Sequence, residues 1–248
     1  MGTVIMLAAV TALLLWWDVS LKAMQALSRP IARRHLDRVV WKMAHALLSL
    51  ARHYGGLTVE LDRRLVTDVP SPTLVCANHQ SVADIVVLFD ALRAHRLRFV
   101  AKKELARGFP AVSEVLRIQR HALINRMGDY RRGSQELRRL GRETRDGVSP
   151  VVFPEGTRSR TGEVYEFRAG GIRTILGQAT VPITAVAVDG GYRIASFADI
   201  TRGLSSIRYR AHLVGVFHHD GTKQSVLTAI GQAEAAVRAQ VERWRAPT

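Results

Sequence analysis

Short apolar runs alternate with helical segments after Tyr54-Gly55-Gly56, and this alternation constrains the fold more than any other feature. Apolar runs bounded by turn residues are typical of buried strands, and helical segments between them are typical of sheet crossovers. Strands are expected over residues 57–61, 73–77, 98–101, 122–125, 151–153, 183–188 and 207–217, and helices over 84–93, 128–145, 170–178 and 222–244. The pattern predicts one α/β domain over residues 55–248, with a mixed sheet flanked by helices.

The first 17 residues are uncharged, and their apolar run, residues 4–17, ends in Trp16 and Trp17. A helix of this length spans about 26 Å, just short of a bilayer core of about 30 Å. Seven basic residues and one acidic residue follow between Lys22 and Arg52. Because basic flanks stay in the cytoplasm, we expect attachment to the cell (inner) membrane, with the α/β domain on the cytoplasmic side.

Residues 35–54 have the pattern of an amphipathic helix, with apolar side chains at helical spacing and basic ones mostly elsewhere. Two interpretations fit this pattern. The apolar face packs on the domain core, or the helix lies in the membrane interface with its basic face on anionic lipid. With the apolar run, it makes residues 1–54 an N-terminal membrane-associated two-helix segment that precedes the α/β domain.

The net charge of +15 favours anionic partners such as nucleic acid, lipid headgroups or phosphorylated substrates. A nucleic-acid binder would use the arginine-rich residues 129–147, but it would not need an apolar N-terminus. We therefore expect an anionic membrane surface, and no nucleic acid, as a partner. Cys76 is the single cysteine, which excludes an internal disulfide, and its apolar neighbours indicate a buried thiol.

The stretch "CANHQSVADIVVL" joins an expected strand to an expected helix and carries His79 and, five residues later, Asp84. The carboxylate of Asp84 is close enough in sequence to hold one imidazole nitrogen, which leaves the other facing a pocket. An imidazole held in this way is a suitable general base, because its pKa lies near neutrality and the carboxylate stabilises the imidazolium. Taken alone, such a pair more often has a structural role.

Three further polar patches follow expected strands, where side chains can meet a ligand at the carboxyl edge of a sheet. Taken alone, the lysine pair in the first of them is more often a solvated charge pair. In the last of them, glycine permits close approach of the backbone and an arginine offers a fork for phosphate. The patches are "RFVAKKELARGFP" with Lys102 and Lys103, "ALINR" with Asn125 and Arg126, and "VVFPEGTRSRTG" with Glu155, Gly156 and Arg158.

The ordered motifs "NHQSVAD", "AKKEL", "LINR", "FPEGTRS" and "VPI" resemble those of the glycerolipid acyltransferase family, of the 1-acylglycerol-3-phosphate acyltransferase type. The resemblance extends from about Leu57 to Asp189, and it departs from the commonest pattern at Asn125, where the family often has Asp. It implies that His79 is the general base for the hydroxyl of the acceptor and that Asp84 orients it. It also implies an acceptor site for phosphate and glycerol, with Pro182 on the acyl side of the pocket. The residues assigned to the acceptor site by resemblance are Lys103, Arg126, Glu155, Gly156, Thr157 and Arg158.

The resemblance implies transfer of an acyl group from a thioester to the hydroxyl of a lysophospholipid. The donor is acyl-CoA or acyl carrier protein, and we expect no cofactor and no metal. His218 and Asp220 in "FHHDG" are interpreted as a turn and not as part of an iron site. Acylation of a lyso-ornithine-type aminolipid stays open within the enzyme class. A non-catalytic membrane-binding or nucleic-acid-binding protein is the alternative from other classes.

Overall fold

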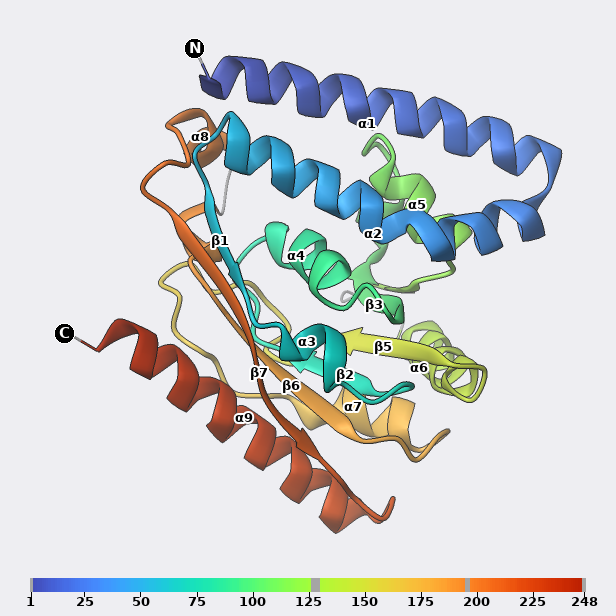
Figure 1. Ribbon diagram of the computed structural model, residues 1–248. Coiled ribbons are helices and arrows are strands. Elements are labelled where there is room, and N and C mark those ends of the chain that lie inside the picture. The colour runs from blue at the N-terminus through green and yellow to red at the C-terminus, as the bar shows by residue number, and fades with distance from the viewer. Residues whose placement is uncertain (1, 126–129, 195–196, 247–248) are drawn as a thin grey trace.

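A seven-stranded mixed sheet forms the centre of the protein in a computed structural model that describes residues 2–125, 130–194 and 197–246 (Figure 1). The strand order is β1-β7-β6-β2-β5-β3-β4, and β7 runs antiparallel to β6 but parallel to β1. The remaining neighbours are parallel, so β2 to β6 all end at one edge. The strands are β1 (Thr58–Leu61), β2 (Leu74–Ala77), β3 (Arg96–Lys102), β4 (Ala122–Ile124), β5 (Val148–Val152), β6 (Ile183–Asp189) and β7 (Arg208–Phe217).

Helices cover both faces of the sheet because the strands alternate apolar side chains between them. On β2, Val75 and Ala77 join one hydrophobic cluster, whereas Leu74 and Cys76 join the other. The first cluster includes residues of α2 (Arg29–His53), α4 (Ala83–Ala91) and α5 (Val112–Ile118). The second includes residues of α6 (Tyr130–Thr144), α7 (Ala169–Leu176) and α9 (Lys223–Arg245). The remaining short helices are α3 (Arg64–Thr67), α8 (Phe197–Thr201), η1 (Lys103–Ala106) and η2 (Gly191–Ile194).

The two N-terminal helices form an antiparallel pair, with α1 (Gly2–Leu27) outermost and α2 between α1 and α4 (Figure 1). Leu36 and Leu48 on α2 are buried in the domain core, so the apolar face of this helix packs on the protein. Asp37 of α2 also accepts a 2.6 Å hydrogen bond from the fully buried Arg98 of β3. The core-packing interpretation of this amphipathic helix therefore holds.

The first helix is longer than the apolar run that predicted it. It continues through Asp18 and Lys22, which form an ion pair of 2.6 Å one turn apart. Only Met6 and Leu21 are buried, and the exposed side chains include Val4, Trp16 and Val19. Of the helices that the structure describes, α1 is the one with the length and hydropathy to cross a membrane.

The predicted α/β class, the mixed sheet and all seven predicted strands are confirmed. The four predicted helices correspond to α4, α6, α7 and α9, with ends shifted by a few residues. The helix α5 was not predicted, because it has only seven residues and is too short to display a helical period.

Candidate active site

His79 and Asp84 meet at the carboxyl end of β2, where the first follows the strand and the second lies in the first turn of α4. Nδ1 of His79 is 2.7 Å from Oδ2 of Asp84. The carboxylate is fully buried, whereas the imidazole is 15% exposed. Because an ionised carboxylate only accepts hydrogen bonds, the proton lies on Nδ1 and Nε2 presents its lone pair. The contact predicted from the sequence is therefore present.

The carboxylate of Asp84 is held by three donors besides the imidazole. The backbone N–H groups of Gln80 and Ser81 donate to Oδ2 at 2.7 and 2.9 Å. The hydroxyl of Tyr209, which lies on β7, donates to Oδ1 at 2.5 Å. These hydrogen bonds replace the water that the buried carboxylate of Asp84 lacks and fix its orientation beside the imidazole.

Asn78 and Phe153 fix the backbone and the ring of His79. The amide of Asn78 donates to the backbone oxygen of Val188 at 2.9 Å and accepts from its N–H at 2.8 Å. This pair of bonds ties the end of β2 to β6. The ring of Phe153 stacks on the imidazole with a centroid distance of 4.0 Å and an interplanar angle of 13°. The asparagine of the motif is thus a structural clamp next to the base.

Glu155 connects the His79 loop to the loop that follows β5. Its Oε1 accepts from the backbone N–H of His79 at 2.7 Å, and its Oε2 accepts from the N–H of Tyr165 at 3.2 Å. The side chain is 2% exposed, and this burial raises the pKa of Glu155 to about 7. Both carboxylate oxygens accept hydrogen bonds from backbone groups, so the geometry gives Glu155 a positioning role between the two loops, and its contact with the acceptor stays a prediction.

The polar patches lie at the ends of four neighbouring parallel strands, in the order β2-β5-β3-β4. His79 follows β2, Glu155 follows β5, Lys103 follows β3 and Asn125 follows β4. Gly156 adopts a φ of +73°, which a residue with a side chain rarely tolerates. Two exposed residues of the same loop, Thr157 and Arg158, come next in the chain.

Of the remaining predicted residues, one is not described by the structure and one lies at another edge of the sheet. Arg126 falls outside the residues that the structure describes. Pro182 precedes β6, and its backbone oxygen accepts from Thr73 and Leu74 at the start of β2. Because β2 and β6 are parallel, Pro182 lies at the opposite edge of the sheet from His79. Pro182 therefore does not lie beside His79, and its assignment to the acyl side of the pocket stays a prediction.

Sequence reasoning missed Tyr209 and Gln80, which complete the surroundings of Asp84. Gln80 is fully buried, and its amide donates to Asp189 at 3.2 Å and to two backbone oxygens. Tyr209 is a tyrosine at a core-facing position of a strand, and a buried tyrosine hydroxyl requires a partner. This requirement is a signal in the sequence that Tyr209 has a polar partner, but it does not identify Asp84 as that partner.

The other candidate groups have structural surroundings. Burial raises the pKa of the Cys76 thiol, as its apolar neighbours predicted. Asp220 accepts from the N–H of Thr222 at 2.8 Å at the start of α9, where it belongs to a turn. Within the described ranges, no group of three or more His, Cys, Asp or Glu side chains is placed to hold a metal ion.

An imidazole oriented by a buried carboxylate at the carboxyl edge of a mixed α/β sheet is suited to general base catalysis on a hydroxyl group. Residues 59–189 match the family described as Acyltransferase, which is more than half of the chain. The chain therefore belongs to the Acyltransferase family. The match contains every described residue of the site except Tyr209.

Relatives and a solved structure agree with this membership. The chain is 33% identical over 164 residues to a lyso-ornithine lipid O-acyltransferase of Rhizobium meliloti, covering 66% of this chain and 48% of the relative. It is 27% identical over 165 residues to a probable 1-acyl-sn-glycerol-3-phosphate acyltransferase of Mycoplasma pneumoniae, covering 64% and 60%. The chain thus spans about half to three fifths of the length of these relatives.

The fold is that of a solved 1-acyl-sn-glycerophosphate acyltransferase from Thermotoga maritima, with a TM-score of 0.72. The two chains are 21% identical, and the superposition covers 100% of this chain and 96% of the other. The similarity therefore includes the N-terminal helix pair as well as the sheet.

Proposed function

We propose that the protein is an O-acyltransferase that moves a fatty acyl group from a thioester to the free hydroxyl of 1-acylglycerol-3-phosphate, giving phosphatidic acid. The observation that carries the proposal is the contact of 2.7 Å between Nδ1 of His79 and Oδ2 of Asp84. It leaves Nε2 of a partly exposed imidazole as the base at the carboxyl edge of the sheet. Membership of the Acyltransferase family supports the same chemistry.

In the proposed mechanism, Nε2 of His79 accepts the proton of the hydroxyl as its oxygen attacks the thioester carbonyl carbon. The buried carboxylate of Asp84 stabilises the imidazolium that forms. Collapse of the tetrahedral intermediate breaks the carbon–sulfur bond, and the imidazolium returns its proton to the leaving thiolate. The step needs neither a metal nor a cofactor, because the thiolate is a good leaving group and His79 accepts the proton of the acceptor hydroxyl.

The acceptor site is proposed to contain Lys103, Thr157 and Arg158 around Gly156, with Arg126 contributing from outside the described residues. A guanidinium and an ammonium can bind a phosphate group through charge-assisted hydrogen bonds. The donor is acyl-CoA or acyl carrier protein, both of which are anionic and suit a chain of net charge +15.

A lyso-ornithine-type aminolipid is the second candidate acceptor. The relative from Rhizobium meliloti, which is 33% identical, is named for that lipid, and its hydroxyl would require the same base. A phosphate monoester carries more negative charge than this aminolipid, so a basic acceptor site favours 1-acylglycerol-3-phosphate.

We propose attachment to the cell (inner) membrane, with the sheet domain on the cytoplasmic side. The apolar helix α1 and homologues that act on membrane lipids support membrane association. The excess of basic residues between Lys22 and Arg52 supports the cytoplasmic side.

The proposal is tested by assaying the purified protein with a panel of lysolipids and each of the two thioester donors. The product is identified by mass, and wild type is compared with His79→Ala. Formation of phosphatidic acid by wild type alone is the expected result. Acylated ornithine lipid as the main product would select the second acceptor, and no acylated lipid with any acceptor would exclude acyl transfer.

A further inference from the structure

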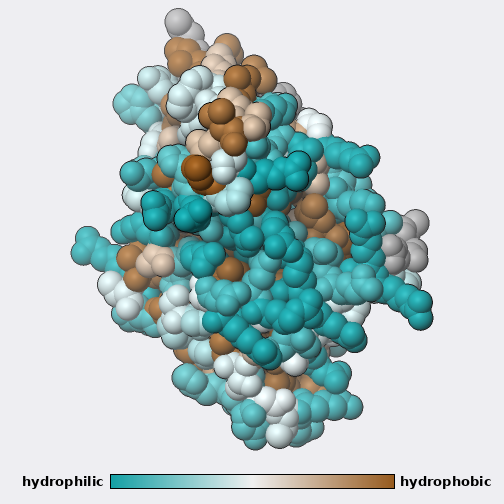
Figure 2. Space-filling view, turned by 90° about the vertical axis from the view of Figure 1, so that its right-hand side faces the viewer, coloured by the Kyte–Doolittle hydropathy of each residue, from teal (hydrophilic) through white to brown (hydrophobic). Residues whose placement is uncertain are grey.

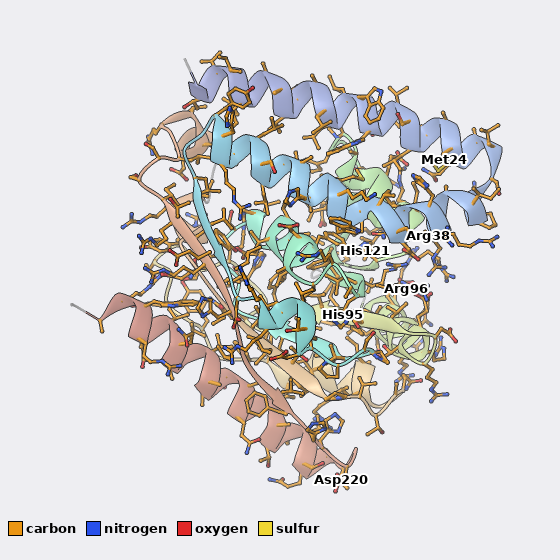
Figure 3. The ribbon with its side chains drawn as sticks, in the orientation of Figure 1. Met24, Arg38, His95, Arg96, His121 and Asp220 are labelled. Atoms are coloured by element: carbon orange, nitrogen blue, oxygen red, sulfur yellow. The ribbon has the colours of Figure 1, made fainter. Side chains whose placement is uncertain are left out.

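A large basic pocket lies at the amino edge of the sheet, opposite the edge that carries His79. It has a volume of ≈ 1140 Å³, and its lining includes Arg96 at the start of β3 and Val148 at the start of β5. His79 instead follows the carboxyl end of β2, which is parallel to β5. Figure 3 shows Arg96 on the side of the molecule where Met24 marks the end of α1. We call this cavity the amino-edge pocket.

The charges of the amino-edge pocket do not balance. Seven Lys and Arg side chains and four carboxylates line it. One of these carboxylates, Glu143, contacts three arginines, namely Arg33 at 3.3 Å, Arg120 at 3.5 Å and Arg139 at 2.9 Å. The carboxylates hold the guanidinium groups in place but do not neutralise them, so the pocket retains an attraction for an anion.

A second carboxylate is shared in the same way. Asp37 contacts Arg98 at 2.6 Å and Arg96 at 3.4 Å. Burial lowers the pKa of Arg98 most, and the nearby charges of Arg33 and Arg96 lower it further, against the opposing effect of Asp37. The guanidinium groups that contact Glu143 and those that contact Asp37 are therefore close enough to repel one another. A phosphate bound between them would relieve that repulsion.

Two more lining arginines, Arg29 and Arg34, form no ion pair or hydrogen bond with any residue that the structure describes. Both lie in the first turns of α2. The N-cap residue Ser28 makes no side-chain capping hydrogen bond. The first helical residues, Arg29 and Pro30, line the pocket, so the positive end of the helix dipole lies beside it. Both arginines are available to a ligand from outside the chain.

Two exposed apolar side chains lie close in sequence to the arginines of α2 that line the amino-edge pocket. Leu27 is 89% exposed and Ile31 is 59% exposed, and they flank Arg29 in the sequence. Figure 2 faces this side of the molecule and shows hydrophobic side chains gathered at the top, over α1, above a hydrophilic surface. Phosphate groups lie just outside the acyl chains of a bilayer. A surface with apolar side chains on one side and basic side chains next to them therefore matches the boundary of a membrane.

We infer that the amino-edge pocket binds the phosphate group of an anionic membrane lipid, at a site separate from the catalytic one. The lipid phosphate contacts Arg29 and Arg34, with Arg33 behind them, and its acyl chains contact Leu27 and Ile31. Helix α1 starts near the end of α2, beside Tyr54, and ends near this pocket. A lipid bound here would fix the far end of α1 on the bilayer and set the orientation of the sheet domain.

The test compares the double variant R29Q/R34Q with R38Q/K42Q in the full-length protein. Both remove two exposed positive charges from α2, but Arg38 and Lys42 do not line the pocket. Binding is measured by flotation with vesicles of phosphatidylcholine alone and with added phosphatidylglycerol. R29Q/R34Q should bind the anionic vesicles about 10- to 30-fold more weakly, since each basic residue at a membrane contributes about 1 kcal/mol.

The control R38Q/K42Q should lose less than about threefold, and all proteins should bind neutral vesicles equally. Equal losses for the two double variants would mean a general charge effect and would overturn the site, as would unchanged binding of R29Q/R34Q. Inorganic phosphate is tested separately, to distinguish a soluble phosphate ligand from a lipid phosphate. If it stabilised wild type against heat as much as anionic vesicles do, the ligand would be a soluble phosphate. Flotation measures no acyl transfer, so this test is independent of the proposed activity.

Discussion

The hydroxyl of Tyr209 and the imidazole of His79 hold opposite oxygens of the same carboxylate, that of Asp84. Tyr209 donates to Oδ1 at 2.5 Å and Nδ1 of His79 donates to Oδ2 at 2.7 Å. Burial and the charge of Asp84 raise the pKa of Tyr209, so its hydroxyl remains a donor. The carboxylate therefore cannot rotate without breaking a bond, and Tyr209 is a positioning residue for the base although it lies beyond the family match.

Tyr209→Phe tests this role. The change leaves Oδ1 of Asp84 buried without its hydroxyl donor, which should lower the free energy of unfolding by about 1–3 kcal/mol. Without the hydrogen bond from Tyr209, more negative charge remains on the carboxylate of Asp84, which then stabilises the imidazolium of His79 better. The acidic limb of the pH profile of kcat should therefore shift to higher pH. The exposed Tyr130→Phe is the control. A stability loss with an unaltered pH profile would assign Tyr209 to the core alone.

His79→Ala should lower kcat by about 10²–10⁴-fold, because it removes the general base. Asp84→Ala should lower it less, since the imidazole remains but loses its orientation and the stabilisation of its charged form. Initial rates of acyl transfer to detergent-dispersed lysolipid measure both. Circular dichroism checks folding, which matters most for Asp84 because it is fully buried. Activity of His79→Ala near that of wild type would refute the mechanism.

Glu155→Gln should remove a pH dependence of stability. The pKa of Glu155 rises from 4.5 to about 7 in the folded protein because the group is buried. Its contribution is therefore fully present below pH 4.5 and is lost as the pH rises through about 7, a change of about 3 kcal/mol. Urea unfolding in detergent, from pH 4.5 to 8, gives the difference between wild type and variant. A constant difference across this range would contradict the burial of an ionisable group at this position.

Arg158→Lys should raise KM for 1-acylglycerol-3-phosphate by about tenfold, because an ammonium cannot reproduce both hydrogen bonds of the guanidinium fork. KM for the thioester donor should change much less. Arg160→Lys, two residues further along the same exposed loop, is the matched control. Equal losses for both substrates would count against a phosphate site at Arg158 and would favour the aminolipid acceptor.

The sequence predicted those parts of the fold and site that depend on local pattern. Seven strands were found from apolar runs, and His79 with Asp84 from their spacing after a strand. Contacts between segments distant in sequence could not be found in this way. Tyr209 reaches Asp84 from 125 positions away, and the pairing of Pro182 with the start of β2 depends on strand register. Sheet order and register arise from tertiary packing, which a single sequence does not display.

The exposed face of α1 should attach the protein to membranes, and the structure determines how this is tested. Deleting both N-terminal helices would be a poor experiment. It would remove Leu36 and Leu48 from the core and leave the fully buried Arg98 without its partner Asp37, at a cost of about 3–5 kcal/mol. Substitutions on the outer surface of α1 leave these contacts intact.

Leu15, Trp16 and Val19 are 50%, 63% and 67% exposed on α1. Changing all three to Gln should weaken vesicle binding by more than about tenfold, since burial of each apolar side chain contributes about 1.5–3 kcal/mol. Activity on lysolipid in bilayers should fall more than activity on the same lysolipid in detergent, because only the first requires the anchor. Tyr130→Gln, an exposed aromatic on α6, is the control. If the folded triple variant still floated with vesicles in high salt and used bilayer substrate normally, α1 would not be the anchor.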